Sequence, residues 1–408
     1  MSAPAALFNY AAEAIRAWRN GLNADAALRD FMRRHPRFPQ AGREKLTRAV
    51  FAYFRWQRWL SANDRLPNQI EAANALQERF NHDPRSVKDQ TLAARAVPDW
   101  VLAELDFGAD EPTATARKHA WLRSLQTTPP LWLRARPGQA AALAKKLGHC
   151  APAEHPLASD ALRYTGPADL YRSAPFNAGE FEIQDLASQL VGAICAPRPG
   201  ETWWDACAGE GGKSLHLADQ MANKGTLWCS DRSKRRLDTL KRRFTRAQLY
   251  NYRLAPWETP DHLPTKTKFD GILVDAPCSG VGTWARNPDA RWTTTLNDVE
   301  ELAAVQRGLL EKMAGSLKPG GRLVYAVCTL TRRETTEVAT AFASAHPEFT
   351  SLPLDLGASG ATRENGASGD PQSALHNFGD SSEGGTQVLL WPQDLRANGM
   401  FVAAWQRK

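Results

Sequence analysis

Cysteine is scarce in this sequence. The 408 residues include six cysteines, and no two of them form a CxxC pair. This argues against a disulfide framework and against a structural zinc site, and it fits a reducing, cytoplasmic setting. The nine histidines show no metal-ligand spacing, so we predict no bound metal.

Long hydrophobic runs are absent as well. No apolar stretch approaches the roughly 18 residues that a membrane span needs, so we predict no membrane association. The N-terminal stretch MSAPAALFNYAAEAIRAWRNG has a helical pattern and lacks the basic start, apolar block and cleavage site of a signal peptide, and a transit peptide is the minor alternative. Nothing in the sequence indicates an oligomeric state, and a monomer is the default expectation.

Positive charge is concentrated near the N-terminus. The formal net charge is +7, and residues 1–100 carry sixteen Lys or Arg against ten Asp or Glu. This balance favours a polyanionic partner such as nucleic acid. Apolar residues recur at three- and four-residue steps between 46 and 60, which is typical of a helix, and we predict an all-α domain over 1–120. Basic residues near them either follow a phosphate backbone or form a solvated face: Arg43, Lys45, Arg48, Arg55 and Arg58.

Two further regions follow this domain. Residues 121–185 contain several prolines between short apolar strands, which predicts a small α/β connector that contacts RNA. From 186 to 408, strand-like and helix-like segments alternate, which is typical of a doubly wound, Rossmann-like α/β fold with a parallel sheet. Within it, residues 355–386 are rich in Gly, Ser, Asn and Asp and predict a flexible insertion. The last two strands, near 387–391 and 399–405, are expected to form an antiparallel pair.

A glycine-rich turn, CAGEGGKS at 207–214, follows the predicted strand 202–206 and opens a helix. Its glycines let a ligand approach the backbone, and the helix N-terminus offers free N–H donors. A phosphate-binding loop would need glycine at Cys207, and a dinucleotide fingerprint would need glycine at Ser214. S-adenosylmethionine fits best, with Asp231 after the next strand to hold the ribose hydroxyls. A turn without a ligand is the alternative.

Two cysteines occupy similar positions along the chain. Cys278 in DAPCSG and Cys328 in YAVCTL each follow a short apolar run that predicts a buried strand. Ligands bind at the carboxyl ends of strands in an open α/β sheet, so both thiols are expected to face one pocket. A thiolate added to C6 of a pyrimidine makes C5 able to accept a methyl group. This chemistry also needs an acid near N3 of cytosine, and Asp275 is well placed for that role.

Several motifs together resemble one family. DAPCSGVGTWARNPDARW (275–292), DACAGEGGKS (205–214), FEIQDLASQLVG (181–192) and YAVCT (325–329) are similar to motifs of the Sun family of RNA (cytosine-C5)-methyltransferases. The resemblance covers roughly 125–408. It implies a class I methyltransferase fold, S-adenosylmethionine as methyl donor and an RNA substrate, with ribosomal RNA favoured and transfer RNA second. The N-terminal region is similar to the NusB-like RNA-binding domain of RsmB-like members.

The resemblance also implies site residues. It makes Cys328 the nucleophile, Cys278 the residue that assists product release, and Asp275 the group near N3. The cofactor site is implied at Asp231, at Asp275 and along the glycine turn: Cys207, Ala208, Gly209, Glu210, Gly211, Gly212 and Lys213. The aspartate that the family places near adenine is absent, and Trp257 and Glu258 occupy the corresponding stretch.

Arg286, Arg291 and Trp292 follow the DAPCSG loop. We predict that they contact RNA, because arginine pairs with phosphate and an indole stacks on a base. A packing role is the alternative for the tryptophan.

Other classes of protein fit less well. A DNA cytosine methyltransferase would carry a Glu-Asn-Val triplet, which is absent, and an amino methyltransferase would carry Asn/Asp-Pro-Pro-Tyr/Phe in place of Asp-Ala-Pro-Cys. A non-catalytic RNA-binding or ribosome-assembly factor that keeps the fold is the alternative from a different class. A missing motif cysteine would favour that alternative, and both cysteines are present.

Overall fold

The structure is a computed structural model that describes residues 3–259, 262–354, 356, 375–378 and 385–408. The chain divides into two compact units. Unit 1 consists of Met1–Pro129 and Thr283–Leu296, and unit 2 consists of Pro130–Gly282 and Asn297–Lys408. The predicted connector and the predicted methyltransferase domain therefore fall in one unit, while the segment that follows the DAPCSG loop falls in the other.

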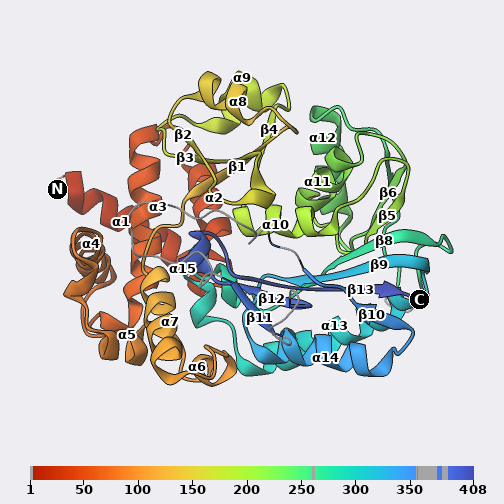
Figure 1. Cartoon of the computed structure of the whole chain (residues 1–408). Helices are drawn as coiled ribbons and strands as arrows, with labels where there is room; N and C mark the ends of the chain where they lie inside the picture. The colour runs from red at the N-terminus through yellow and green to blue at the C-terminus, as the bar shows by residue number, and fades with distance from the viewer. Residues whose placement is uncertain (1–2, 260–261, 355, 357–374, 379–384) are drawn as a thin grey trace, which may run out of the picture. The chain divides into compact units, whose positions relative to one another are not determined.

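Unit 1 is helical, as the periodicity of its sequence predicts (Figure 1). Its longer elements are α1 (Ala3–Arg19), α2 (Ala24–Arg34), α3 (Gln40–Trp56), α4 (Leu66–His82), α5 (Asp89–Arg95), α6 (Val101–Glu104) and α7 (Glu111–Ser124). The apolar stripe of α3 is buried at Leu46, Val50, Tyr53 and Trp56. Asn23 begins α2 by accepting a hydrogen bond from the Ala26 amide, a typical N-cap that satisfies a free donor.

Unit 2 begins with a small antiparallel sheet of order β2-β3-β1-β4. Its strands are β1 (Leu131–Ala135), β2 (Cys150–Pro152), β3 (Ala161–Tyr164) and β4 (Phe181–Ile183), with the helices α8 (Ala140–Leu147) and α9 (Ala174–Asn177) between them. A compact apolar core fills it, centred on Leu133, Leu162 and Phe181.

The large sheet of unit 2 carries the features that position the site. Its parallel strands lie in the order β7-β6-β5-β8-β9, and β13 joins β9 in antiparallel fashion. They are β5 (Thr202–Asp205), β6 (Thr226–Cys229), β7 (Tyr252–Leu254), β8 (Phe269–Asp275), β9 (Leu317–Val327) and β13 (Met400–Arg407). The remaining edge holds β12 (Gln387–Leu390) and β11 (Leu375–Phe378), and β10 (Phe349–Ser351) pairs with β13. The predicted closing pair is confirmed as β12 and β13.

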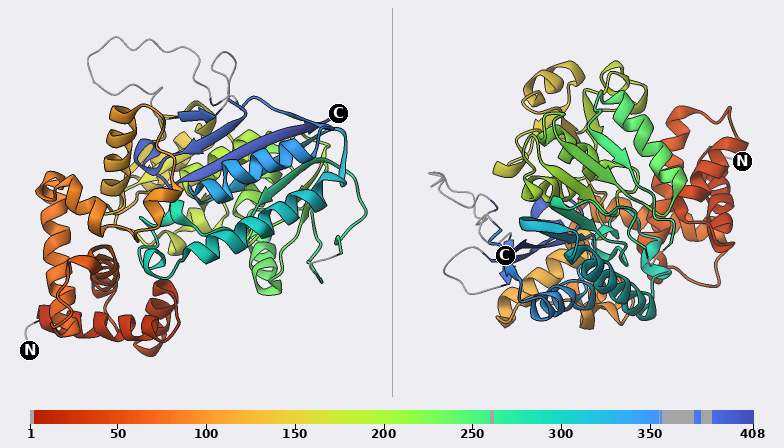
Figure 2. Two further views of the ribbon diagram at one scale, coloured as in Figure 1. Left: turned by 90° about the horizontal axis from the view of Figure 1, so that it is seen from below. Right: turned by 90° about the vertical axis from the view of Figure 1, so that its right-hand side faces the viewer.

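Helices cover both faces of this sheet (Figures 1 and 2). One layer contains α10 (Leu186–Cys195), α11 (Gly212–Gln220) and α12 (Lys234–Arg246), and the other contains α13 (Leu296–Ala314) and α14 (Thr336–Ala345). The short helix α15 (Pro392–Leu395) lies between β12 and β13 in the chain. This is the doubly wound, Rossmann-like architecture predicted from the alternating pattern.

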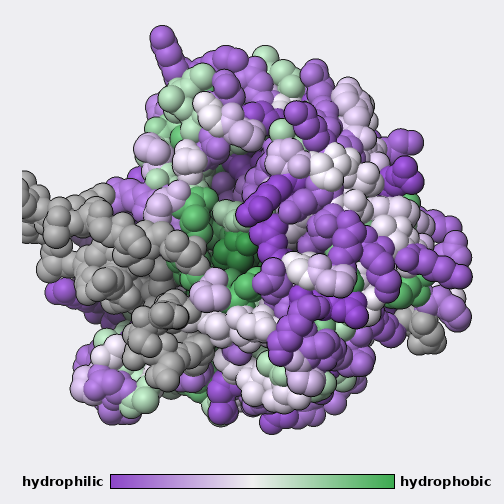
Figure 3. All heavy atoms as spheres, turned by 45° about the vertical axis from the view of Figure 1, so that its right-hand side comes forward, coloured by the Kyte–Doolittle hydropathy of each residue, from purple (hydrophilic) through white to green (hydrophobic). Residues whose placement is uncertain are grey.

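Most of the predicted insertion at 355–386 lies outside the described residues. No helix in the described part of the chain is long and apolar enough to cross a membrane. Hydrophilic side chains predominate on the face shown in Figure 3.

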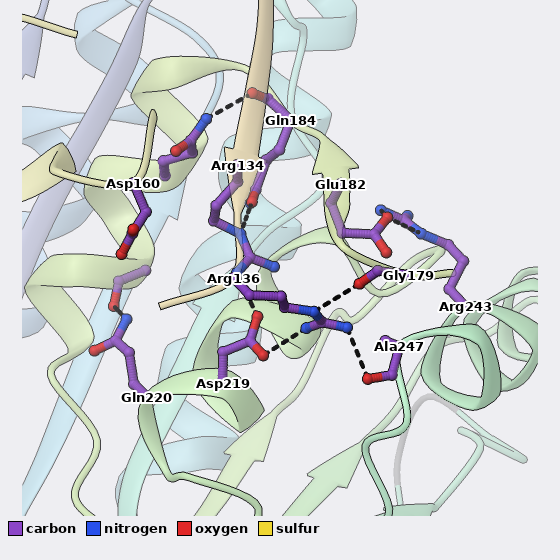
Figure 4. Close-up of polar contacts among 12 residues, drawn as sticks. Arg134, Arg136, Asp160, Gly179, Glu182, Gln184, Asp219, Gln220, Arg243 and Ala247 are labelled. Carbon is purple, nitrogen blue, oxygen red and sulfur yellow. Dashed lines mark hydrogen bonds and ion pairs between the residues drawn. The ribbon is translucent and has the colours of Figure 1, made fainter. Parts of the chain in front are cut away.

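Two buried carboxylates join the small sheet to the helices of the large one (Figure 4). Asp219 of α11 accepts from Arg134 and Arg136, with N···O distances of 2.5 Å for both. Glu182 of β4 accepts from Arg243 at 3.0 Å and from Arg246 at 2.5 Å, both on α12. Each carboxylate is thus shared by two guanidinium groups, which compensates charge that would be costly to bury alone.

Candidate active site

The glycine-rich turn connects β5 to α11. Gly209 and Gly211 have φ of +54° and +86°, a backbone region that favours glycine. A Cβ on Gly211 would lie 2.8 Å from Leu240 Cγ, so this glycine is also required by packing. The turn is anchored to the strand by Ser214, whose hydroxyl donates to Asp205 at 2.6 Å. Burial raises the pKa of Asp205 to about 7.

A cavity of about 760 Å³ opens at this turn. It is lined by all but one of the predicted cofactor residues: Cys207, Ala208, Gly209, Glu210, Gly212, Lys213, Asp231 and Asp275. Gly211 is the exception, because it faces Leu240 instead. An added Cβ at Gly209 or Gly212 would meet nothing within 4 Å, so both leave the backbone accessible to a ligand.

Asp231 follows β6 at the edge of this cavity. Its Oδ2 accepts from the amide of Gly209 at 3.0 Å, and its Oδ1 accepts from the amide of Ser233 at 2.7 Å. The carboxylate is therefore held rigidly beside the glycine turn. A carboxylate at the end of the second strand is the group that binds a ribose diol in nucleotide-binding folds.

Lys213 and Asp275 form an ion pair across the cavity. Lys213 Nζ lies 2.7 Å from Asp275 Oδ2, and the two residues come from the start of α11 and the end of β8. Burial alone would lower the pKa of Lys213, but the attraction of Asp275 outweighs it and raises that pKa. The ammonium group therefore stays charged.

The two motif cysteines meet at the ends of adjacent strands. β8 and β9 pair in parallel with Asp275 opposite Ala326, so the loops after them begin side by side. Cys278 Sγ lies 3.3 Å from Cys328 Sγ, and both side chains are partly exposed. The sequence predicts that both thiols face one pocket. The two sulfurs do lie together, but neither cysteine lines the cavity at the glycine turn, which Asp275, Ala276 and Pro277 of the same loop do line.

The two thiols differ in their surroundings. The pKa of Cys328 is lowered, chiefly by its hydrogen bond with Cys278. Burial and the negative charge of Asp275 oppose this shift, and the positive charge of Lys213 adds to it. The pKa of Cys278 is raised well above its ordinary value by the same hydrogen bond, by burial and by the negative charge of Glu334. Cys328 is thus the better thiolate, and Cys278 is the better proton donor.

Glu334 fixes both cysteine loops, although it belongs to neither motif. Its side chain is fully buried. It accepts from the Ser279 amide at 2.8 Å and from the Ser279 hydroxyl at 2.5 Å, and from the Thr329 hydroxyl at 3.2 Å. Gln306 and Thr331 donate to it at 3.0 and 2.9 Å. One carboxylate therefore holds the residue after each cysteine.

The predicted RNA contacts lie in unit 1. Arg291 is fully buried, and its guanidinium donates to the carbonyls of Trp284, Ala96 and Leu125. The prediction that Arg291 contacts RNA does not fit this placement, because backbone carbonyls already take its donors. Trp292 is half-buried and donates to the Phe54 carbonyl at 2.7 Å.

Arg286 is half-buried, and its amide donates to the Thr283 carbonyl at 2.9 Å. In α3, Arg55 is 3% exposed and donates to the Ala285 carbonyl at 3.2 Å, so it too is unsuited to follow a phosphate backbone. The segment 283–296 is a structural part of the helical unit.

Several cavity residues were not predicted from the sequence. Gln184 and Ser188 stand in the FEIQDLASQLVG motif, and Trp257 stands in the stretch where the family has an aspartate, so each carried a partial signal. Trp257 donates to the Ala206 carbonyl at 2.9 Å and stacks on Trp204. One face of α13 completes the lining through Ala304, Val305, Gly308, Leu309 and Lys312, whose spacing is that of a helical stripe.

The sheet order, the glycine turn and the carboxylate after β6 define a class I methyltransferase fold. Three solved structures share this fold. The crystal structure of PH0851 has a TM-score of 0.77 at 21% identity and covers 100% of both chains. A methyltransferase homologue from Pyrococcus horikoshii has a TM-score of 0.57 at 24% identity and covers 76% of this chain and 98% of its own. NSun6 from the same organism, determined with SFG, has a TM-score of 0.57 at 18% identity over 72% of this chain and 95% of its own.

Sequence comparison identifies the family. The model described as 16S rRNA methyltransferase RsmB/F matches residues 193–406, which is more than half of the chain. The chain therefore belongs to the RsmB/F methyltransferase family, as its motifs predict.

Curated relatives carry related names. A probable ribosomal RNA small subunit methyltransferase B from Bacillus subtilis is 40% identical over 176 residues, 43% of this chain and 39% of that protein. Ribosomal RNA small subunit methyltransferase B from Yersinia pestis is 32% identical over 257 residues, 62% of this chain and 58% of that protein. The chain thus spans about half the length of these relatives.

Proposed function

We propose that this protein transfers a methyl group from S-adenosylmethionine to C5 of a cytosine in RNA. The observation that carries the proposal is the pair of thiols 3.3 Å apart, next to a cavity that holds Lys213 and Asp275. Ribosomal RNA is the favoured substrate, because the family and the curated relatives are named for it. Transfer RNA is the runner-up. A cytoplasmic location remains a prediction from the scarcity of cysteine.

The cavity fits S-adenosylmethionine. Gly209 and Gly212 leave room for the methionine end near the N-terminus of α11, and Asp231 is placed to accept from the ribose hydroxyls. Trp257 offers an aromatic wall in place of an acidic group near adenine. When bound, the cofactor supplies an electrophilic methyl group.

Cytosine requires activation because C5 is a poor nucleophile. In our proposal the Cys328 thiolate adds to C6, and electron density moves through the ring towards N3. Asp275, ion-paired with Lys213, faces this developing charge, and a proton from the pair passes to N3. C5 then takes the methyl group. A water molecule accepts the C5 proton, the C–H electrons restore the C5–C6 double bond, and the C6–S bond breaks with its electrons leaving on the Cys328 sulfur, while the N3 proton returns to the Asp275–Lys213 pair. Cys278 promotes this collapse by donating to the departing thiolate.

The surroundings of the sulfurs support this division of roles. Lys213 places a positive charge near Cys328, which favours the thiolate that attacks. The hydrogen bond with Cys328 and burial keep the Cys278 thiol protonated, and the negative charge of Glu334 adds to their effect. The target base must leave its stack, because a paired cytosine cannot present C6 to a sulfur.

Adduct trapping tests the proposal. Purified protein is incubated with S-adenosylmethionine and an unmodified ribosomal RNA fragment, and protein–RNA adducts are resolved on a denaturing gel. We expect Cys328→Ala to abolish both methylation and the adduct, and Cys278→Ala to let the adduct accumulate. Cys150→Ala, which changes a half-buried cysteine of the small sheet, is the matched control. Adduct accumulation in Cys328→Ala would reverse the assignment, and no methylation by the unaltered protein would refute the proposal.

A further inference from the structure

Unit 2 contains a second groove beside the cofactor cavity. Its volume is about 490 Å³. Tyr171 and Phe176 line it together with Arg242, Arg243 and Arg246 of α12. Glu210 of the glycine turn lines both this groove and the cofactor cavity, so the two are adjacent. The size suits a group as large as one nucleotide.

An aromatic ring is exposed in this groove. Tyr171 is 64% exposed, and its ring packs edge-on against Phe176 at a centroid distance of 5.1 Å. The Arg246 guanidinium covers the Phe176 ring at 3.8 Å from its centroid. The Phe176 ring is therefore held in place, while the Tyr171 ring remains open to solvent. An exposed aromatic ring of this kind is suited to stack on an unpaired base.

The groove also carries positive charge. Three arginines and two glutamates line it, which leaves a surplus of one positive charge. Glu182 already holds Arg243 and Arg246, whereas Arg242 is exposed and is oriented by a hydrogen bond to Thr239 at 2.9 Å. The exposed surface of α12 and its N-terminal flank is basic beyond the groove: Arg232, Lys234, Arg235, Arg236 and Lys241. Such a surface attracts a polyphosphate backbone.

We infer that this groove binds a nucleotide of the single-stranded RNA that flanks the methylated cytosine. Tyr171 stacks on its base, and Arg242 pairs with its phosphate. The inference rests on the proposed function, and it adds a contact that the predicted RNA-binding residues did not include. An acidic peptide would satisfy the arginines but would leave the flat ring without a matching partner.

Binding of a fluorescent single-stranded RNA oligonucleotide, measured by anisotropy with S-adenosylhomocysteine present, tests the groove. We expect Tyr171→Ala to weaken binding about tenfold and Tyr171→Phe to leave it near the original value, because stacking needs the ring alone. Tyr250→Ala is the matched control, since Tyr250 is 69% exposed and does not line the groove.

The salt dependence tests the charged contact separately. We expect Arg242→Gln to lower the slope of log affinity against log salt by about 0.7, the value for one phosphate contact on a single strand. Arg198→Gln, an exposed arginine before β5, should leave the slope unchanged. Each variant should retain S-adenosylhomocysteine affinity, which shows that it folds.

Three outcomes separate this inference from the proposed function. If Tyr171→Ala leaves RNA affinity unchanged and Arg242→Gln leaves the salt slope unchanged, with methylation intact, the inference that the groove binds RNA is wrong while the proposed function stands. Displacement of RNA by an acidic peptide that binds more tightly would overturn the inference as well. Failure of the unaltered protein to methylate any RNA would instead refute the proposed function, on which the groove depends.

Discussion

At the scale of single residues, the site depends on how four groups share charge. Lys213 faces Asp275, and its charge also favours the thiolate of Cys328. The sulfurs of Cys278 and Cys328 lie 3.3 Å apart, within hydrogen-bond distance. A hydrogen bond between the thiols and a nearby cation both favour a thiolate at Cys328, a common way to make a thiol reactive near neutral pH.

The charge of Lys213 leads to a prediction about pH. Lys213→Gln removes a cation that stabilises the Cys328 thiolate, so the pKa of Cys328 should rise and less thiolate should be present at neutral pH. Alkylation of Cys328 by iodoacetamide, followed by mass spectrometry between about pH 5 and 10, should therefore be slower at neutral pH, with its midpoint moved to higher pH.

Two controls accompany this measurement. Lys224→Gln changes an exposed lysine and should leave the profile unchanged. Cys150, whose pKa is raised by burial, should react at the same rate in all variants. An unaltered Cys328 profile in Lys213→Gln would show that the cation does not act on this thiol.

At the scale of elements, the loops after β8 and β9 are joined through Glu334. Its carboxylate accepts hydrogen bonds from Ser279 and Thr329, the residues that follow the two cysteines. The Tyr325 hydroxyl donates to the backbone carbonyl of Glu334 at 2.6 Å. Without the carboxylate, several buried donors would lose their acceptor. Glu334 therefore acts as a positioning residue for both thiols.

We expect Glu334→Ala to lower the free energy of unfolding by roughly 3 kcal/mol, because buried donors are left unpaired. Glu334→Gln should cost less, because hydroxyls can rotate to donate or accept. The rate of disulfide formation between Cys278 and Cys328 under mild oxidation reports their separation, and it should fall in Glu334→Ala. Glu337→Ala, an exposed glutamate nearby, is the control. An unchanged rate in Glu334→Ala would show that the loops hold their positions without this tether.

Much of the element order followed from the sequence, because apolar periodicity and glycine turns act locally. The strands and helices of the large sheet lie close to their predicted positions, and the cofactor turn was located from its glycines. Glu334 was missed because its partners are brought to it by the pairing of β8 with β9, which no local pattern reveals. Arg291 was predicted to contact RNA because it is a basic residue after the DAPCSG loop. That sequence pattern is the same whether its guanidinium donates to phosphates or, as here, to backbone carbonyls.

At the scale of the whole molecule, the chain returns to the helical unit after the DAPCSG loop. Trp284 and Arg291 are fully buried there, and Arg291 bridges carbonyls that follow α5 and α7. The stability of unit 1 should therefore depend on a segment more than 150 residues away from the rest of it in sequence.

Arg291→Ala tests this dependence. We expect roughly 2–3 kcal/mol of lost stability in unit 1, because buried carbonyls lose their donors. Hydrogen exchange in α5 and α7 should accelerate, whereas exchange around the cofactor cavity of unit 2 should not change. Arg198→Ala is the control. Unchanged exchange together with weaker RNA binding would instead restore the RNA contact first predicted for Arg291.

The shared carboxylates of Asp219 and Glu182 limit where the protein can be truncated at its N-terminal side. A shortened version that starts at residue 186 would retain Asp219 but discard Arg134 and Arg136, and would retain Arg243 and Arg246 but discard Glu182. Asp219 would then lack its two guanidinium partners, and Arg243 and Arg246 would lack their shared carboxylate. A shortened protein that keeps unit 2 stable should therefore begin no later than Pro130, although the first of the family motifs starts at residue 181.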